Sequence, residues 1–178
     1  MHPPIMRTAL NIGAFYGISS FAFFLFLYSK GLAPGSSSSW LGAWIPILFS
    51  VWGIRTYRDH ECGGTISYWH AFRAGFLTIA CGALLFGLLF YLYGIIGSTD
   101  LLDNYKQEML KEVEQTESAM KSLLGDKIYD TMVDNVNKTT LASVAVSDFF
   151  NKCLSGFFLS LIVAAFLKRN PPPSEEII

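Results

Sequence analysis

Four long apolar runs restrict the folds open to this chain. The first covers residues 8–28 and contains no charge, and the others cover residues 37–54, 74–97 and 149–167. A helix needs about 20 mostly apolar residues to cross the hydrocarbon core of a bilayer. Only 15% of the residues are charged, against about 25% in ordinary soluble domains. We therefore predict an all-α membrane protein with four transmembrane helices.

The segment between the third and fourth runs is polar but periodic. Apolar residues recur there at spacings of three, four or seven, and Gly125-Asp126 interrupts the pattern; they are Leu102, Tyr105, Met109, Val113, Met120, Leu123, Ile128, Met132 and Val136. This pattern is typical of two amphipathic helices joined by a tight turn. We predict a helical hairpin over residues 98–148, and one four-helix membrane domain formed by residues 1–97 and 149–178.

The positions of the basic residues predict the orientation. One group lies close to the ends of the apolar runs: Arg7, Arg55, Arg58, Arg73, Lys168 and Arg169. The 98–148 segment instead mixes its lysines with ten acidic residues. Basic residues beside spans favour the cytoplasmic side, where the leaflet is anionic. Both termini and the loop over residues 55–73 are therefore expected in the cytoplasm, and the hairpin outside it.

The middles of the predicted spans contain no Asp, Glu, Lys, Arg or His. Ion-coupled transporters, proton relays and voltage sensors normally carry such groups at membrane depth. The spans contain small residues at helix-packing intervals instead, among them Gly13, Gly17, Gly75, Gly87 and Gly156. Small residues let helix backbones approach closely. These stripes are interpreted as packing surfaces, either within the bundle or against a span of another protein.

The stretch IRTYRDHECGGTISYWHAF, residues 54–72, concentrates the polar chemistry of the chain. His60, Cys62 and His70 could in principle ligate a metal, or pair as nucleophile and base. Zinc sites usually show tighter pairs, such as Cys-x-x-Cys or two histidines four residues apart. No third orienting group accompanies them. We therefore expect no catalytic residue, no metal and no cofactor.

A structural interpretation suits this stretch better. Arg55, Arg58, Asp59 and Arg73 are candidate contacts for a lipid phosphate or for a partner protein. Gly63-Gly64 is expected to form a turn with positive φ. A helix capped by Thr65 or Ser67 should then lead into the third span.

The same stretch resembles a known family. The motif Arg55-x-x-Arg58-Asp59, Gly63-Gly64-x-Ile66-Ser67-Tyr68, Ala71-Phe72-x-x-Gly75 is similar to that of the bacterial family known as domain of unknown function 4199. The four-span layout with an acidic segment between spans three and four is also similar. The resemblance implies a small protein of the Gram-negative inner membrane, with no assigned activity and an association with genes for membrane-linked glycosyltransferases. It implies no catalytic residue.

Three functions are compatible with these features. The first is a non-enzymatic accessory or scaffold subunit of a membrane complex, with a membrane glycosyltransferase as a candidate partner. The second is a small homo-oligomeric transporter, channel or lipid-handling protein, suggested by the glycine stripes and the basic rim. The third is a membrane enzyme that uses His60, Cys62 and His70. In each case the chain contacts the lipid bilayer, and no nucleic-acid partner is expected.

Overall fold

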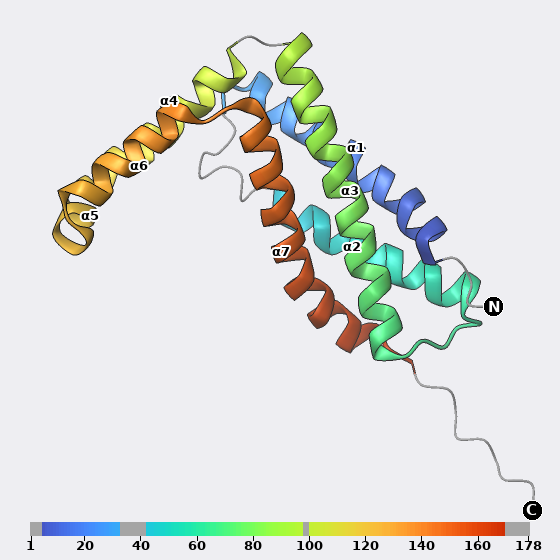
Figure 1. The fold of residues 1–178 in the computed structure, drawn as a ribbon. Helices are drawn as coiled ribbons and strands as arrows, with labels where there is room; N and C mark the ends of the chain where they lie inside the picture. The colour runs from blue at the N-terminus through green and yellow to red at the C-terminus, as the bar shows by residue number, and fades with distance from the viewer. Residues whose placement is uncertain (1–4, 33–41, 98–99, 170–178) are drawn as a thin grey trace, which may run out of the picture. The chain divides into compact units, whose positions relative to one another are not determined.

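The computed structural model describes residues 5–32, 42–97 and 100–169, and this part of the chain is helical (Figure 1). Its elements are α1 (Ile5–Ser29), α2 (Trp44–Thr56), the π-helical turn η2 (Tyr57–Glu61), α3 (Tyr68–Ile96), α4 (Leu101–Gln115), α5 (Glu117–Leu124), α6 (Asp126–Lys138) and α7 (Leu141–Leu167). The described residues form no strand, and one isolated antiparallel bridge joins Ile66 to Arg169. The predicted all-α class is confirmed.

Within the described ranges, three helices are long and apolar enough to cross a membrane. They are α1 with 25 residues, α3 with 29 and α7 with 27. These helices contain the first, third and fourth predicted spans. Their lipid-facing character is visible in the many large apolar side chains that stay exposed, such as Phe15, Leu84 and Phe166. We conclude that the chain is a multi-pass membrane protein.

The second predicted span, residues 37–54, is only partly described. Residues 37–41 lie outside the described part of the chain, and α2 has 13 residues. A helix of that length extends about 20 Å, short of the roughly 30 Å of a hydrocarbon core. Pro46 is the third residue of α2, a position where its missing N–H costs no intrahelical bond. A fourth crossing therefore stays a prediction.

Helix α7 begins eight residues before the predicted span, at Leu141. Its start is capped reciprocally: Ser143 N donates to Thr140 Oγ1 at 3.2 Å, and Thr140 N donates to Ser143 Oγ at 3.0 Å. This is the hydrogen-bond exchange of a capping box, with serine in the place of the usual glutamate. Thr140-x-x-Ser143 was the sequence signal for this start.

Two helices were predicted over residues 98–148; the described part of this segment holds α4, α5 and α6, followed by the first eight residues of α7. The first predicted helix is broken at Thr116, which separates α4 from α5. The Thr116 hydroxyl donates to the carbonyls of Glu112 and Val113, and such local bonds compete with continuation of the helix. The predicted break at Gly125, which has φ +85°, is confirmed. Of the predicted apolar stripe, the side chains of Met120 and Leu123 lie outside the described residues.

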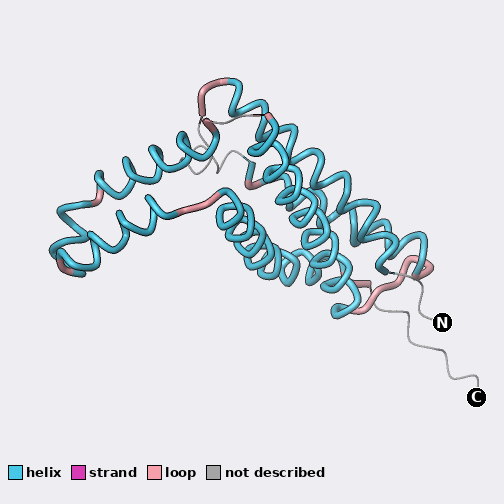
Figure 2. Tube along the Cα trace, turned by 45° about the horizontal axis from the view of Figure 1, so that its top comes forward, coloured by secondary structure: helices cyan, strands magenta, loops and turns pink. Residues whose placement is uncertain are grey.

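Helices α4 and α6 lie side by side (Figures 1 and 2). Lys106 Nζ donates to the Asn137 carbonyl at 2.8 Å, which ties the start of α4 to the end of α6.

The chain divides into two compact units. The first unit comprises Met1–Ser20, Ala43–Phe86 and Phe149–Ile178, and the second comprises Phe21–Gly42 and Gly87–Asp148. The second unit is held by aromatic side chains of α1 and α3. Phe24 packs edge-on against Phe90 at 5.3 Å between centroids, and Tyr28 packs edge-on against Tyr93 at 6.2 Å. Asn104 of α4 donates to the Tyr28 hydroxyl at 3.2 Å, so α4 is fixed to this cluster.

Glycines bring the helices of the first unit close to backbone contact. A Cβ built on Gly13 would lie 2.9 Å from the Thr78 carbonyl oxygen, and one on Gly17 would lie 2.7 Å from the Gly82 carbonyl oxygen. One on Gly82 would lie 2.6 Å from the Gly13 carbonyl oxygen and would overlap the Tyr16 ring. The Gly13-x-x-x-Gly17 pair of α1 therefore packs directly on Gly82 of α3. This is the close approach that small residues permit in membrane helices.

Candidate functional site

The segment between α2 and α3 folds into a compact loop, residues 57–67, which we call the clamp loop. Its centre is the Arg58 carbonyl, which accepts hydrogen bonds from Gly64 N at 2.9 Å and from Cys62 N at 3.3 Å. Gly63 and Gly64 have φ values of +62° and +86°, which confirms the predicted glycine turn. These values lie in the left-handed region that glycine adopts without a steric penalty.

The clamp loop is attached to the end of α7. Ile66 N donates to the Arg169 carbonyl at 2.8 Å, and Arg169 N donates to the Ile66 carbonyl at 2.9 Å. Ile66 is buried in a cluster with Ile54, Tyr57, Ala71, Ala74, Val163 and Ala164. Ile5, the first described residue of α1, packs against the same cluster. One small core therefore joins α1, α2, α3 and α7 at this end of the first unit.

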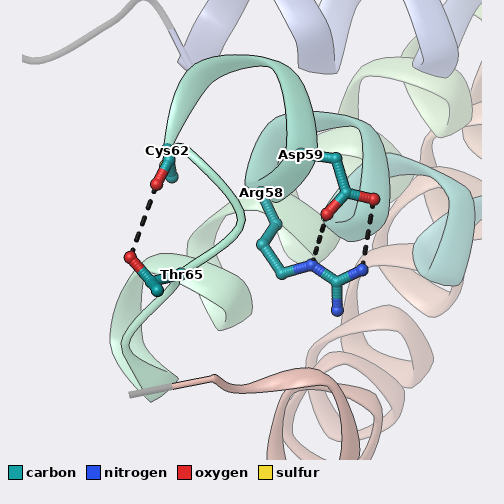
Figure 3. Close-up of polar contacts among 4 residues, drawn as sticks. All are labelled: Arg58, Asp59, Cys62 and Thr65. Carbon is teal, nitrogen blue, oxygen red and sulfur yellow. Dashed lines mark hydrogen bonds and ion pairs between the residues drawn. The ribbon is translucent and has the colours of Figure 1, made fainter. Parts of the chain in front are cut away.

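Arg58 and Asp59 form the polar centre of the clamp loop (Figure 3). Arg58 Nε donates to Asp59 Oδ1 at 2.7 Å, and Arg58 Nη2 donates to Asp59 Oδ2 at 3.1 Å. The Arg58 side chain is 9% exposed and that of Asp59 is 49% exposed. Two parallel bonds of this kind are the strong geometry of an arginine–carboxylate pair. Arg58 is thus engaged inside the loop, whereas Arg55 and Arg73 are exposed.

The electrostatics of the pair fit this geometry. The hydrogen bond from Arg58 lowers the pKa of the Asp59 carboxyl, and the charges of Arg58, Arg169 and His60 act in the same direction. A lowered folded-state pKa gives stability that is fully present above the unfolded-state value of about 4. This stability is lost as the pH falls through the folded-state pKa. The pair should therefore hold the loop throughout the neutral range.

The structure separates the three residues considered as ligands or catalysts. His70 Nδ1 shares a hydrogen bond of 2.8 Å with Ser67 Oγ, at the start of α3. Cys62 lies beside Tyr57; burial raises the pKa of the Tyr57 hydroxyl, and Cys62 adds to that rise. His60 is exposed on η2. Over the described ranges, no three His, Cys, Asp or Glu side chains gather as metal ligands would.

The predicted packing glycines differ in how closely they are approached. A Cβ on Gly156 would lie 2.5 Å from Ile79 Cγ2, and one on Gly75 would lie 2.8 Å from Ser50 Oγ. A Cβ on Gly87 would meet only the Ala145 carbonyl oxygen, at an ordinary 3.5 Å. Gly87 is therefore not needed for close approach, while Gly82, which spacing did not single out, is.

Two serines of the bundle were not recognised as a pair in the sequence. Ser50 of α2 and Ser160 of α7 are fully buried, and both hydroxyls face Gly75 of α3. Neither oxygen has a hydrogen-bond partner among the described residues. A buried hydroxyl without a partner costs free energy, so these serines are retained at some expense of stability.

The family comparison agrees with the motif of the clamp loop. The sequence model of the family described as "Protein of unknown function (DUF4199)" matches residues 11–169. The chain belongs to this family. The matched range extends from the second turn of α1 to the Ile66–Arg169 bridge, so it contains the clamp loop, most of α1 and the whole of α3 and α7. No curated protein and no solved structure matches the chain.

The two parallel hydrogen bonds from Arg58 to Asp59 in this DUF4199 protein can be tested through the reactivity of the Cys62 thiol. We expect Arg58→Lys to raise the rate of Cys62 alkylation by N-ethylmaleimide several-fold, because a lysine ammonium cannot make the two parallel bonds. Mass spectrometry of the Cys62 peptide distinguishes it from Cys81 and Cys153. Arg55→Lys changes an exposed arginine of the same segment and should leave the rate unchanged. Equal rates of Cys62 alkylation in both variants and the wild type would show that the Arg58–Asp59 pair does not hold the clamp loop.

The two buried serine hydroxyls without hydrogen-bond partners lead to two predictions about the melting temperature. Ser160→Ala and Ser50→Ala should leave the melting temperature in detergent unchanged or raise it, because each removes a desolvated hydroxyl and no hydrogen bond. Gly75→Ala should lower it, and by less in the Ser50→Ala background, because Ser50 Oγ is the nearest atom to the added methyl group. Strictly additive effects would contradict this contact.

Proposed function

We propose that this chain is a non-enzymatic accessory or scaffold subunit of a membrane protein complex in the bacterial cytoplasmic membrane. The observation that carries the proposal is the uncharged interior of its bundle. The buried polar or charged residues in the described ranges are Thr8, Ser20, Ser50, Arg58, Thr78 and Ser160. Arg58 is the one charged residue among them, and it lies in the clamp loop. Proteins that move ions or protons use ionisable groups at membrane depth.

The contacts of the first unit support a four-span topology. Ile5 at the start of α1 packs against the core that contains Ile54, near the end of α2. With α1 as a crossing, this contact favours a return of the chain across the membrane between Ser29 and Ile54. Arg169, after α7, is paired with Ile66 beside the same core. The two described ends of the chain thus meet at one core, which supports residues 37–54 as the fourth crossing.

The basic residues at this end support a cytoplasmic placement of both termini. Arg7, Arg55, Arg73, Lys168 and Arg169 are exposed there, and Asp59 and Glu61 are the acids of the clamp loop. The α4–α6 segment is then extracytoplasmic. Its lysines are largely engaged within the segment, as in Lys111 with Glu108, Lys121 with Glu117 and Lys138 with Asp134. Because the segment has more acidic residues than lysines, its surface keeps a net negative charge that a partner could contact.

The partner that we propose is another integral membrane protein. The association of the family with genes for membrane-linked glycosyltransferases makes such an enzyme the first candidate. In this arrangement the bundle supplies a rigid anchor, and the clamp loop and α4–α6 supply contact surfaces on the two sides of the membrane. The partner enzyme would carry the chemistry.

Affinity purification from native membranes tests this function. The tagged chain should be extracted in mild detergent and analysed by mass spectrometry and by size. A second integral membrane protein at constant stoichiometry is the expected result. Deletion of residues 101–138, with a short glycine-serine linker in their place, should release that partner if α4–α6 bind it. Repeated recovery of the chain alone, or of a homo-oligomer alone, would overturn the proposal in favour of a pore-forming or lipid-handling protein.

A further inference from the structure

An aromatic surface runs along α3 and α7 in the first unit. Phe72 stacks on Phe76 at 5.9 Å between centroids, and Phe157 of α7 packs edge-on against both rings, at 5.3 Å and 6.0 Å. Phe158 extends the surface, packing edge-on against Phe157 at 5.6 Å. Phe157 and Phe158 are 40% and 58% exposed. These rings lie on helices that cross the membrane, so their exposed sides face acyl chains.

One end of this surface carries a tryptophan and an arginine. Trp69 packs edge-on against Phe72 at 5.9 Å and is 62% exposed. Arg73 follows it by four residues on α3 and is also exposed. Residues four apart on a helix lie on the same face, one turn apart. An indole N–H and a guanidinium, both hydrogen-bond donors, therefore stand together where the aromatic surface reaches the basic end of the unit.

We propose that this surface binds one anionic phospholipid in a fixed position. Arg73 and the Trp69 indole N–H bind the headgroup phosphate, and the acyl chains lie over Phe72, Phe76, Phe157 and Phe158. The occupant is a lipid rather than a soluble phosphate, because the donors continue directly into an exposed aromatic surface on two spanning helices. The exposed Arg7, Lys168 and Arg169 at the same end add a positive field that selects a net negative headgroup.

Tyr68, at the start of α3, fixes the position of this site. Tyr68 donates its hydroxyl hydrogen bond to the Leu161 carbonyl at 3.3 Å, which ties the first residue of α3 to α7. Tyr68 also packs edge-on against Trp69 at 5.3 Å. The donors on α3 and the rings on α7 are therefore held in register. A lipid at this site would bridge the two helices from outside, independently of any protein partner.

Reconstituted protein tests this site. The purified full chain should be placed in phosphatidylcholine nanodiscs that contain increasing fractions of phosphatidylglycerol, and its melting temperature recorded. We expect saturable stabilisation by phosphatidylglycerol. Arg73→Gln should raise the fraction needed for half-maximal stabilisation about fivefold, as loss of one basic contact near an anionic surface implies. Trp69→Phe, which keeps the ring and removes the N–H, should raise it by a smaller factor.

Arg55→Gln is the matched control. It removes an exposed arginine of α2, a helix that contributes no ring to the aromatic surface, and should change the half-maximal fraction by less than about twofold. Equal losses in the Arg55 and Arg73 variants would show diffuse charge attraction and overturn the site. A melting temperature that does not change with the fraction of phosphatidylglycerol would also overturn it. So would equal stabilisation by inorganic phosphate added to pure phosphatidylcholine nanodiscs. All variants should melt together with the wild type in pure phosphatidylcholine, which confirms that they fold.

Discussion

Replacement of Gly82 by alanine is expected to lower the stability of the protein by about 3 kcal/mol or more, as overpacking of a tight interior does. The added methyl group would lie 2.6 Å from the Gly13 carbonyl oxygen and would overlap the Tyr16 ring. A side chain can change rotamer, but a helix backbone can move only as a whole. The methyl group therefore forces α1 and α3 apart and loses the contact of Gly13 and Gly17 with α3. We expect a much lower melting temperature in detergent, and aggregation on size-exclusion chromatography.

Gly87→Ala is the control for this substitution. Gly87 lies on the same helix, but its added methyl group would meet only the Ala145 carbonyl oxygen, at 3.5 Å. Because alanine favours a helix over glycine by up to about 1 kcal/mol, this variant should be neutral or slightly more stable. A similar loss in both variants would mean that glycine is needed along α3 for another reason, and that the close approach at Gly82 does not decide the packing.

This contrast shows what helix spacing can and cannot predict. The small residues of the spans were recognisable as packing positions, and Gly13, Gly17, Gly75 and Gly156 do meet neighbouring helices closely. Spacing along one helix did not separate Gly82 from Gly87. Which glycine lies at a crossing depends on the angle and offset of two helices, and neither quantity is contained in the pattern of one of them.

The clamp loop also combines features that the sequence predicted with features that it did not. The Gly63-Gly64 turn and the start of α3 were predicted because their signals are local. The pairing of Ile66 with Arg169 joins residues more than a hundred positions apart, and no local pattern encodes it. Arg58 resembled the other rim arginines in the sequence. In the structure its side chain is buried and paired with Asp59, whereas Arg55 and Arg73 are exposed.

The clamp loop contributes Tyr57 and Ile66 to a buried core, and substitution of Ile54 tests the stability of that core. Ile54 is fully buried among Tyr57, Ile66 and Ala71. Ile54→Ala should destabilise the protein by about 3 kcal/mol, through lost apolar contact and the cavity that remains. Ile47→Ala removes the same atoms from the same helix. Ile47 is 43% exposed, so that substitution should cost less than about 1 kcal/mol.

The alkylation rate of Cys62 shows whether the destabilisation affects the core beside the clamp loop. In Ile54→Ala, alkylation of Cys62 should accelerate together with the fall in melting temperature, because Cys62 packs against the cluster that contains Ile54. In Ile47→Ala the Cys62 rate should stay at the wild-type value. If both variants were equally mild, the ends of α2, α3 and α7 would be held by the bilayer alone. The rigid face that the proposed scaffold function requires would then be absent.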